Sequence, residues 1–213
     1  MKKSRRIASW ALFAIVIVAV GYGIALTRQG FSARGRPSLI EKFAATTARK
    51  MAVPSDYRKL RNPFSGSPEN IQAGMEHFSD HCATCHANDG GGDTFFGKGL
   101  YPKPPDMRTA ETQNKSDGEL YYTIENGVRL SGMPAFGEEH SVGADAETWH
   151  LVLFIRHLPQ IKSEELDEMK GLNPKTDVDR AEEEQEKEFL KGGEPSENPA
   201  GKTHEHKVKR ETP

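Results

Sequence analysis

Cysteine is scarce in this chain of 213 residues, in which Cys82 and Cys85 are the only two. A single pair excludes the disulfide framework of small secreted domains. Sustained alternation of apolar and polar residues is also missing, so we expect almost no β-sheet. No cluster of Lys and Arg is interleaved with aromatic residues, which argues against nucleic acid as a partner. Only 35% of the residues are hydrophobic, so we expect part of the chain to stay outside any core.

The N-terminal part of the chain has a net positive charge, unlike the rest. Residues 1–36 contain seven Lys or Arg and no acidic residue, and residues 7–26 are 20 residues without a charge. At about 1.5 Å per residue, a helix of this length just spans a hydrocarbon core of roughly 30 Å. We predict a cytoplasmic segment at 1–6 and a transmembrane anchor at 7–26, with the rest of the chain exported. The alternative is a cleaved signal peptide, although the apolar region of a signal is usually shorter, about 7–15 residues.

Two segments have the composition of connections. Residues 27–66 are predicted to form a polar linker with one short helix, which begins at Ser38 because Ser38 and Glu41 have the spacing of a capping box. Residues 160–213 are dominated by Glu, Lys, Asp, Pro and Gly. Such a composition buries too little apolar surface to offset the entropy of ordering. We therefore expect a mostly disordered C-terminal tail, with one polar helix at 178–190.

Residues 67–159 have the signals of a helical domain. The first helix is predicted to open at Ser67, with proline in the favoured first helical position. The second opens with a capping box at Ser116 and ends at an Asn-Gly pair. The third begins near Asp145 and is ended by Pro159.

The two cysteines stand in the motif Cys82-Ala83-Thr84-Cys85-His86. Thiols at this spacing can each add to one vinyl group of the same haem, and the adjacent imidazole then lies under the iron as an axial ligand. A zinc site would need a second pair of ligands, and the chain has no further cysteine. A thioredoxin-like dithiol would need a βαβ context, which is missing. The motif therefore predicts one covalently attached haem c.

A haem iron that only carries electrons needs a sixth ligand, and methionine in that place raises the reduction potential. Met133 is our candidate, within Gly132-Met133-Pro134-Ala135-Phe136. Proline disfavours helix for the residue before it, so Met133 is held in an extended loop. Met107 is the main alternative ligand; His140 and His150 are further alternatives that would give bis-histidine ligation.

The stretch from Asn62 to Pro159 resembles the class I cytochrome c family, and most closely the bacterial mono-haem variants related to the haem domains of cbb3-type oxidase subunits. On the first helix, Gly74 and Phe78 match the family's glycine and aromatic residue. The matching positions that follow are Gly90, Gly91, Gly92, Asp93, Pro104, Pro105, Asp106, Ile124, Gly127, Gly132, Met133, Pro134, Phe136, Trp149 and Phe154. Met107 departs from the pattern, since the family usually has Leu or Phe there.

This resemblance implies an all-α, class I cytochrome c fold around one haem, preceded by the transmembrane helix and followed by the disordered tail. The first and last helices would cross near Gly74, with Trp149 and Phe154 as structural residues at or near the crossing. A carbonyl of residues 102–105 would accept a hydrogen bond from the other ring nitrogen of His86. The residues expected to line the haem pocket are Pro104, Pro105, Gly132, Pro134 and Phe136.

The function that follows is single-electron transfer between periplasmic or membrane-associated redox partners, by a carrier and not an enzyme. The protein would lie in a bacterial inner membrane with its haem domain facing the periplasm or exterior. One alternative is a fixed haem c subunit of an oxidase, nitric-oxide reductase or dehydrogenase complex. Another is a five-coordinate haem enzyme with peroxidase or gas-binding activity, which requires that Met133 does not bind the iron.

Overall fold

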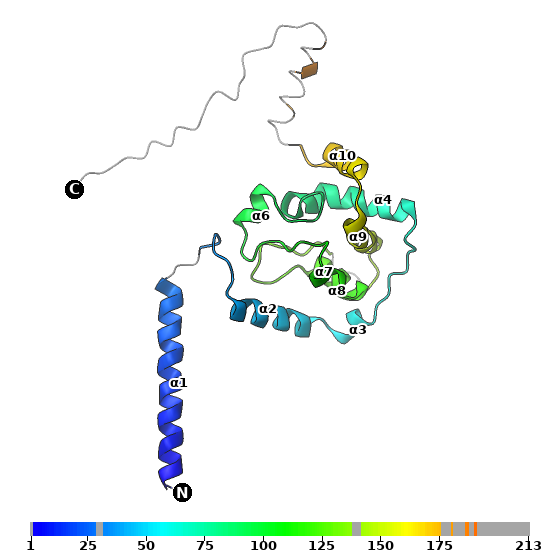
Figure 1. The fold of residues 1–213 in the computed structure, drawn as a ribbon. Helices are drawn as coiled ribbons and strands as arrows, with labels where there is room; N and C mark the ends of the chain where they lie inside the picture. Colours follow the sequence, from blue (N-terminus) through cyan, green and yellow to red (C-terminus); the bar gives the residue numbers. More distant parts are fainter. Residues whose placement is uncertain are drawn as a thin grey trace, which may run out of the picture.

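The regular structure of this chain is helical throughout the part that can be described. The computed structural model describes residues 2–28, 32–137, 142–175, 180, 186–187 and 190, and these residues contain helices and turns but no strand, which confirms the all-α prediction. Figure 1 shows the arrangement. The helices are α1 (Lys2–Arg28), α2 (Leu39–Ala52), α3 (Ser55–Arg58), α4 (Pro68–His77), the π-helical turn η1 (Phe78–Cys82), α5 (Ala83–His86), α6 (Phe95–Gly99), α7 (Ala110–Gln113), α8 (Asp117–Asn126), α9 (Ala146–His157), the 3-10 turn η2 (Leu158–Gln160) and α10 (Ser163–Leu172).

The predicted helix starts are confirmed by their caps. The Ser67 hydroxyl accepts a hydrogen bond from the Asn70 amide at 3.3 Å. Ser116 and Glu119 form the complete capping box predicted at the start of α8. The side chain of Asp145 accepts from the Thr148 amide at 2.8 Å and so caps α9. Each cap satisfies an amide that has no partner inside its helix.

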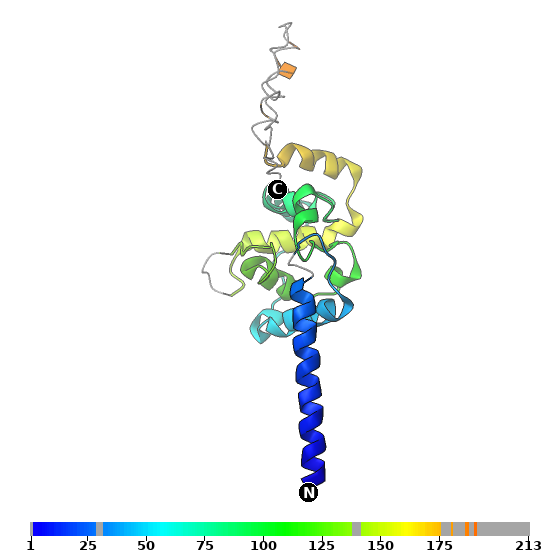
Figure 2. The ribbon, with the colours of Figure 1, turned by 90° about the vertical axis from the view of Figure 1, so that its left-hand side faces the viewer.

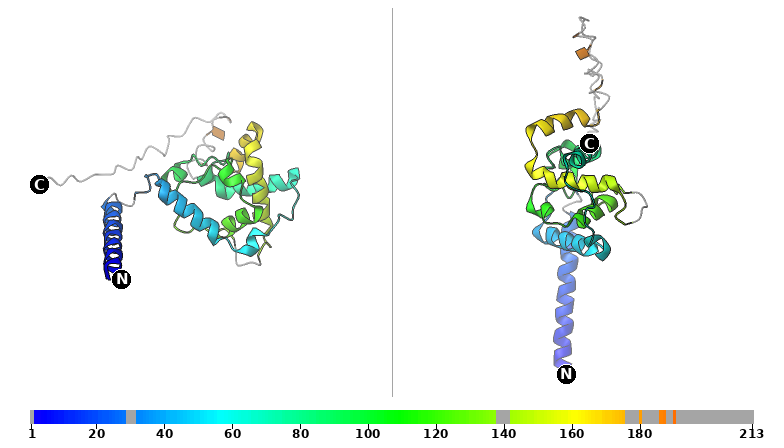
Figure 3. Two further views of the ribbon diagram at one scale, coloured as in Figure 1. Left: turned by 60° about the horizontal axis from the view of Figure 1, so that its bottom comes forward. Right: turned by 90° about the vertical axis from the view of Figure 1, so that its right-hand side faces the viewer.

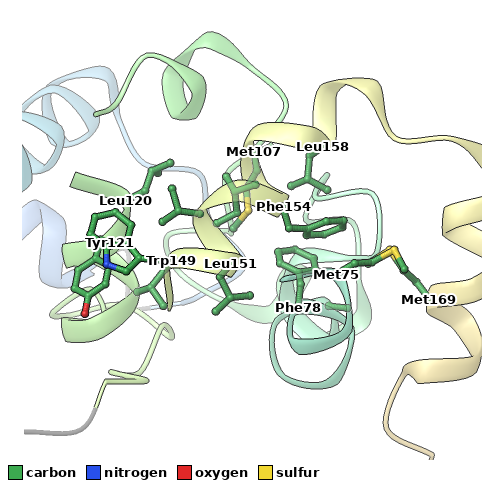
Figure 4. Close-up of a cluster of buried hydrophobic side chains, with 14 residues drawn as sticks. Met75, Phe78, Met107, Leu120, Tyr121, Trp149, Leu151, Phe154, Leu158 and Met169 are labelled. Carbon is green, nitrogen blue, oxygen red and sulfur yellow. The ribbon is translucent and has the colours of Figure 1, made fainter. Parts of the chain in front are cut away.

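Helices α4 and α9 cross at the centre of the domain, and Gly74 lies at the crossing. A side chain there would collide with the carbonyl oxygen of His150 and come within 2.9 Å of the Phe154 Cβ atom. The Phe78 and Phe154 rings then pack with centroids 5.1 Å apart. Figure 4 shows these rings in the buried cluster, with Trp149 and Tyr121 at its other end. Glycine at this one position allows the close approach on which the domain is built.

The prediction of a linker at residues 27–66 is partly wrong, because several of its residues pack on the domain. Val53 is buried, and Tyr57 and Leu60 pack against the core. Gly118 of α8 lies so close to the Tyr57 carbonyl oxygen that any side chain at position 118 would collide with it. The aromatic rings of Tyr57 and Tyr122 meet edge to face, with centroids 4.9 Å apart.

The prediction of a disordered tail from residue 160 is wrong for its first part. Helix α10 packs on α4 and η1, with Met169 completely buried. Glu168 accepts a hydrogen bond from Gln72 of α4 at 2.7 Å. The few apolar residues, Ile161, Leu166 and Met169, lie on the side that meets the domain. The composition of the segment did not reveal them, because most of its residues are charged. The predicted helix at 178–190 lies largely outside the described residues.

Helix α10 and helix α2 lie at opposite ends of the domain, as Figures 1 and 2 agree. Helix α1 extends away from the domain as a separate rod, also in the further views of Figure 3. Among the described residues, no helix meets the combined requirement of length and apolarity for crossing a membrane. The predicted transmembrane anchor is therefore not confirmed.

Candidate functional site

A mostly apolar cavity of about 820 Å³, including its open mouth, lies beside the crossing of α4 and α9. Ligand sites in proteins commonly have volumes of about 300–1,000 Å³. Most of the lining comes from the turn from η1 into α5, the segment 100–107, the loop 128–136 and one face of α9, with single residues added by α2 and α8. Of the residues predicted for the site, it is lined by Cys82, Cys85, His86, Pro104, Pro105, Gly132, Met133, Pro134 and Phe136.

The π-helical turn η1 leads from the crossing directly into the cysteine motif. The Ala83 amide donates to the Phe78 carbonyl five residues earlier, which inserts an extra residue into the helical turn. The hydroxyl of Ser79 donates to the Met75 carbonyl at 2.7 Å in the buried interior. Cys82, the last residue of the turn, and Cys85 of α5 are free thiols at the wall of the cavity. Burial, with a smaller effect of nearby Cys85, raises the pKa of Cys82 to about 12, so its thiol is uncharged at neutral pH.

The imidazole of His86 is suited to bind a metal. The side chain lines the cavity and is only 8% exposed. Burial lowers its pKa to about 4, so the ring is neutral at pH 7 and has a free lone pair. Its Nδ1 atom is fully buried without a hydrogen-bond partner. The predicted bond from this ring to a carbonyl of residues 102–105 is therefore not formed, although Pro102, Pro104 and Pro105 line the same cavity.

The cysteine motif and His86 form one wall of the cavity. A second wall is the loop 128–136, which is attached to α8 by hydrogen bonds. The Val128 amide donates to the Met133 carbonyl, and the Phe136 amide donates to the Ile124 carbonyl, both at 3.1 Å. The Met133 amide donates in turn to the Ser131 hydroxyl at 3.1 Å. The loop begins at Gly127, whose φ of 62° is the left-handed conformation that favours glycine. These bonds hold the thioether of Met133 at the cavity without regular secondary structure.

The alternative ligands differ in position. Met107 also lines the cavity and is buried, and its amide donates to the Gly90 carbonyl at 2.9 Å. His150 does not line the cavity; its ring packs against Phe64 with centroids 4.6 Å apart. His140 lies outside the described residues. Of the alternatives that can be assessed, only Met107 reaches the cavity.

Sequence reasoning missed two basic residues at the cavity, Arg49 of α2 and Lys103. Arg49 is 33 positions before Cys82 in the segment predicted as a linker. It comes to the site through the docking of α2, in which Tyr101 donates to Glu41 at 2.6 Å and Lys42 pairs with Glu111 at 3.1 Å. No local pattern in the sequence indicates such a long-range contact.

The donor set of this cavity fits a haem. Its apolar lining suits a flat porphyrin, the two thiols stand beside the imidazole, and the basic side chains suit the two propionates. The unpaired, buried nitrogen of His86 is the kind of exception that often marks a functional site. Residues 69–155 match the family described as cytochrome c oxidase, cbb3-type, subunit III. This segment is a class I cytochrome c domain.

The cytochrome c domain accordingly binds a covalently attached haem c with its iron. Domains of this family are typically electron carriers. The matched segment runs from the start of α4 into α9, and α2 and α10 lie outside it. A comparison with curated proteins gave no match.

Proposed function

We propose that this protein transfers single electrons through one haem c, attached by Cys82 and Cys85 and ligated by His86 and Met133. The observation that carries the proposal is that these four side chains, from two separate segments, line one apolar cavity. The bound haem supplies a one-electron ferric/ferrous couple. The two thiols would hold the porphyrin through thioether bonds, and the neutral imidazole would hold the iron from the same helical segment.

Met133 is supported over Met107 as the sixth ligand by the chain geometry. The backbone of Met107 is bonded to Gly90, four residues after His86, so Met107 belongs to the wall that already supplies the imidazole. Met133 belongs to the loop fastened to α8, which forms a different wall. His86 and Met133 would therefore hold the iron of a bound haem from two different walls of the cavity. Methionine there favours the reduced iron and closes the position to small molecules.

Arg49 and Lys103 would place positive charge near the haem propionates, while the apolar lining excludes water from the porphyrin faces. With His86 and Met133 both holding the iron, the haem would supply one-electron exchange without a free coordination position. These properties favour a carrier over a five-coordinate enzyme.

We also propose that residues 7–26 anchor the protein in a bacterial inner membrane, with the cytochrome c domain on the periplasmic or outer side. Support comes from 20 residues without a charge after a basic segment at 1–6. The large apolar side chains of α1, from Ile7 to Ile24, are exposed in the isolated helix. Fusion of a C-terminal reporter enzyme that is active only outside the cytoplasm tests this orientation. An inactive reporter on stably produced protein would contradict it.

The partners would be other redox proteins or a respiratory complex. The family name, a subunit of a cbb3-type oxidase, favours a second candidate function as a fixed electron-entry subunit. Purification in mild detergent separates the two possibilities. A stoichiometric larger assembly supports the fixed subunit, and a single chain supports the free carrier.

The direct test of the proposed function is optical spectroscopy and redox titration of the purified holoprotein. We expect a low-spin ferric spectrum with the weak long-wavelength band of iron–methionine ligation, and a reversible one-electron transition. A high-spin spectrum that changes when carbon monoxide is added would instead support the five-coordinate enzyme.

A further inference from the structure

Helix α2 is attached to the cytochrome c domain by its polar side. Glu41 accepts a hydrogen bond from Tyr101 at 2.6 Å, and Lys42 pairs with Glu111 at 3.1 Å. Arg49, two turns later on the same side, lines the haem cavity. None of the residues of α2 is buried. Charged contacts therefore hold this helix, where an ordinary surface helix would be held by an apolar stripe.

The other side of α2 is apolar and faces away from the protein. Leu39, Ile40, Phe43 and Met51 are 87%, 76%, 74% and 75% exposed, respectively. Their spacing puts them on one face of the helix. A soluble domain rarely exposes several large apolar side chains side by side unless that surface meets a partner.

Two basic residues, Lys50 and Arg58, lie at the C-terminal end of this apolar face. A hollow on it is lined by Phe43, Thr46, Thr47, Lys50, Met51 and Arg58. The guanidinium of Arg58 donates to the Lys50 carbonyl at 2.7 Å and to the Met51 carbonyl at 3.3 Å, which holds its charge at the end of α2. Apolar side chains with cations beside them are the pattern of a helix that lies in an anionic lipid surface.

The position of α2 in the chain favours lipid over a protein partner. Only residues 29–38 separate it from α1, and Figure 1 shows it on the side of the domain where α1 ends. Ten residues reach at most about 35 Å when fully extended. The connection has Arg34 and Arg36 and no acidic residue. A helix tethered this closely to an anchor stays within reach of the membrane surface.

We propose that α2 lies in the lipid surface, with its apolar face among the acyl chains and with Lys50 and Arg58 against anionic headgroups. The proposal rests on the anchoring of residues 7–26 proposed above. It has a consequence for the haem, because the opposite side of α2 contributes Arg49 to the cavity. The lipid surface would thereby fix the orientation of the cytochrome c domain and keep its haem cavity close to the membrane.

Spin labelling of the full-length holoprotein tests this. Once haem attachment has consumed both native thiols, one added cysteine is the only thiol left to carry a nitroxide. Thr47→Cys places the label on the apolar face of α2. Ser163→Cys places it on the exposed first residue of α10, at the opposite end of the domain. The protein is reconstituted into vesicles of phosphatidylcholine with phosphatidylglycerol. Flotation of the vesicles reports anchoring, and relaxation of the label by oxygen and by a water-soluble nickel chelate reports its surroundings.

We expect a severalfold higher ratio of oxygen to nickel accessibility at position 47 than at position 163. The ratio at 47 should fall in vesicles of phosphatidylcholine alone, and also in the Lys50→Gln/Arg58→Gln variant. Floating protein with a water-exposed label at 47 would overturn this proposal and leave the anchor intact. Protein that fails to float would overturn both. A label at 47 that neither reagent reaches, in protein that can be cross-linked as a dimer, would show that a second copy of the chain covers the apolar face of α2. That result would also overturn the proposal.

Discussion

The two walls of the haem cavity are built in different ways. The wall that contains Cys82, Cys85 and His86 is one continuous helical segment, reached through a π-helical turn and buried against the crossing of α4 and α9. The wall that contains Met133 is an irregular loop, with backbone and hydroxyl hydrogen bonds to itself and to α8. The first wall is fixed by packing and would be fixed further by covalent bonds. The second wall depends on turn geometry, so we expect its structure to be disrupted first when the protein is destabilised.

The largest effect is expected from removing the covalent bonds on the first wall. The Cys82→Ala/Cys85→Ala variant should lose all haem that survives denaturation, because no other thiol exists. Haem-dependent peroxidase staining of a denaturing gel measures this. Met133→Ala is the matched control and should keep the stain. A stained double variant would contradict the attachment proposal.

Loss of the thioether on the second wall should change the iron without releasing the haem. In Met133→Ala, we expect most of the protein to become high-spin and the reduction potential to fall, because a ligand that favours reduced iron is removed. Optical spectra and redox titration measure both effects. Met107→Leu, at the other methionine of the cavity, should remain low-spin. If the two variants behave in the opposite way, Met107 is the ligand.

The loop geometry itself can be tested at Gly127. An alanine Cβ atom there would lie 2.5 Å from the Pro134 carbonyl carbon, at a φ of 62° that side chains rarely adopt. Gly127→Ala should lower the free energy of unfolding by about 1–3 kcal/mol and increase the high-spin fraction, with covalent haem retained. Denaturant titration and optical spectra measure these changes. Gly99→Ala, where no atom lies within 4 Å, is the control and should change stability by less than about 0.5 kcal/mol.

The smallest effect is expected from substituting Arg49, which lines the cavity but lies outside the matched segment. Arg49→Gln removes a positive charge that disfavours oxidation, so the reduction potential should fall by a few tens of millivolts, as expected for an exposed interaction of about 1 kcal/mol or less. Lys50→Gln is the control, since Lys50 is the next residue but does not line the cavity. Equal shifts in the two variants would show that only net charge matters.

Local signals in the sequence predicted much of the domain. The caps at Ser67, Ser116 and Asp145 each depend on a few neighbouring residues, and each forms in the structure. The motif around Cys82 needs only five adjacent residues to indicate haem. Prediction failed where distant segments meet. The docking of α2 that brings Arg49 to the cavity depends on Tyr101 and Glu111, and neither has a recognisable spacing from α2.

Composition was misleading at the C-terminal side of the domain for a related reason. The free energy of packing α10 comes from a few apolar residues, above all Met169, within a mostly charged segment. An average over many residues hides such a contribution. The π-helical turn was not predicted either, because an i+5 hydrogen bond leaves no composition signal.

The π-helical turn connects two parts of one helical segment that must face different directions: the part that crosses α9 and the part that binds the haem. Each residue of an α-helix turns the chain by about 100°. The extra residue in η1 therefore rotates everything after it relative to the face on which Gly74 meets α9. Without that rotation, a helix aligned for the crossing would aim its cysteines and histidine in another direction. The extra residue therefore allows Gly74 to face α9 while the cysteines and the histidine face the cavity.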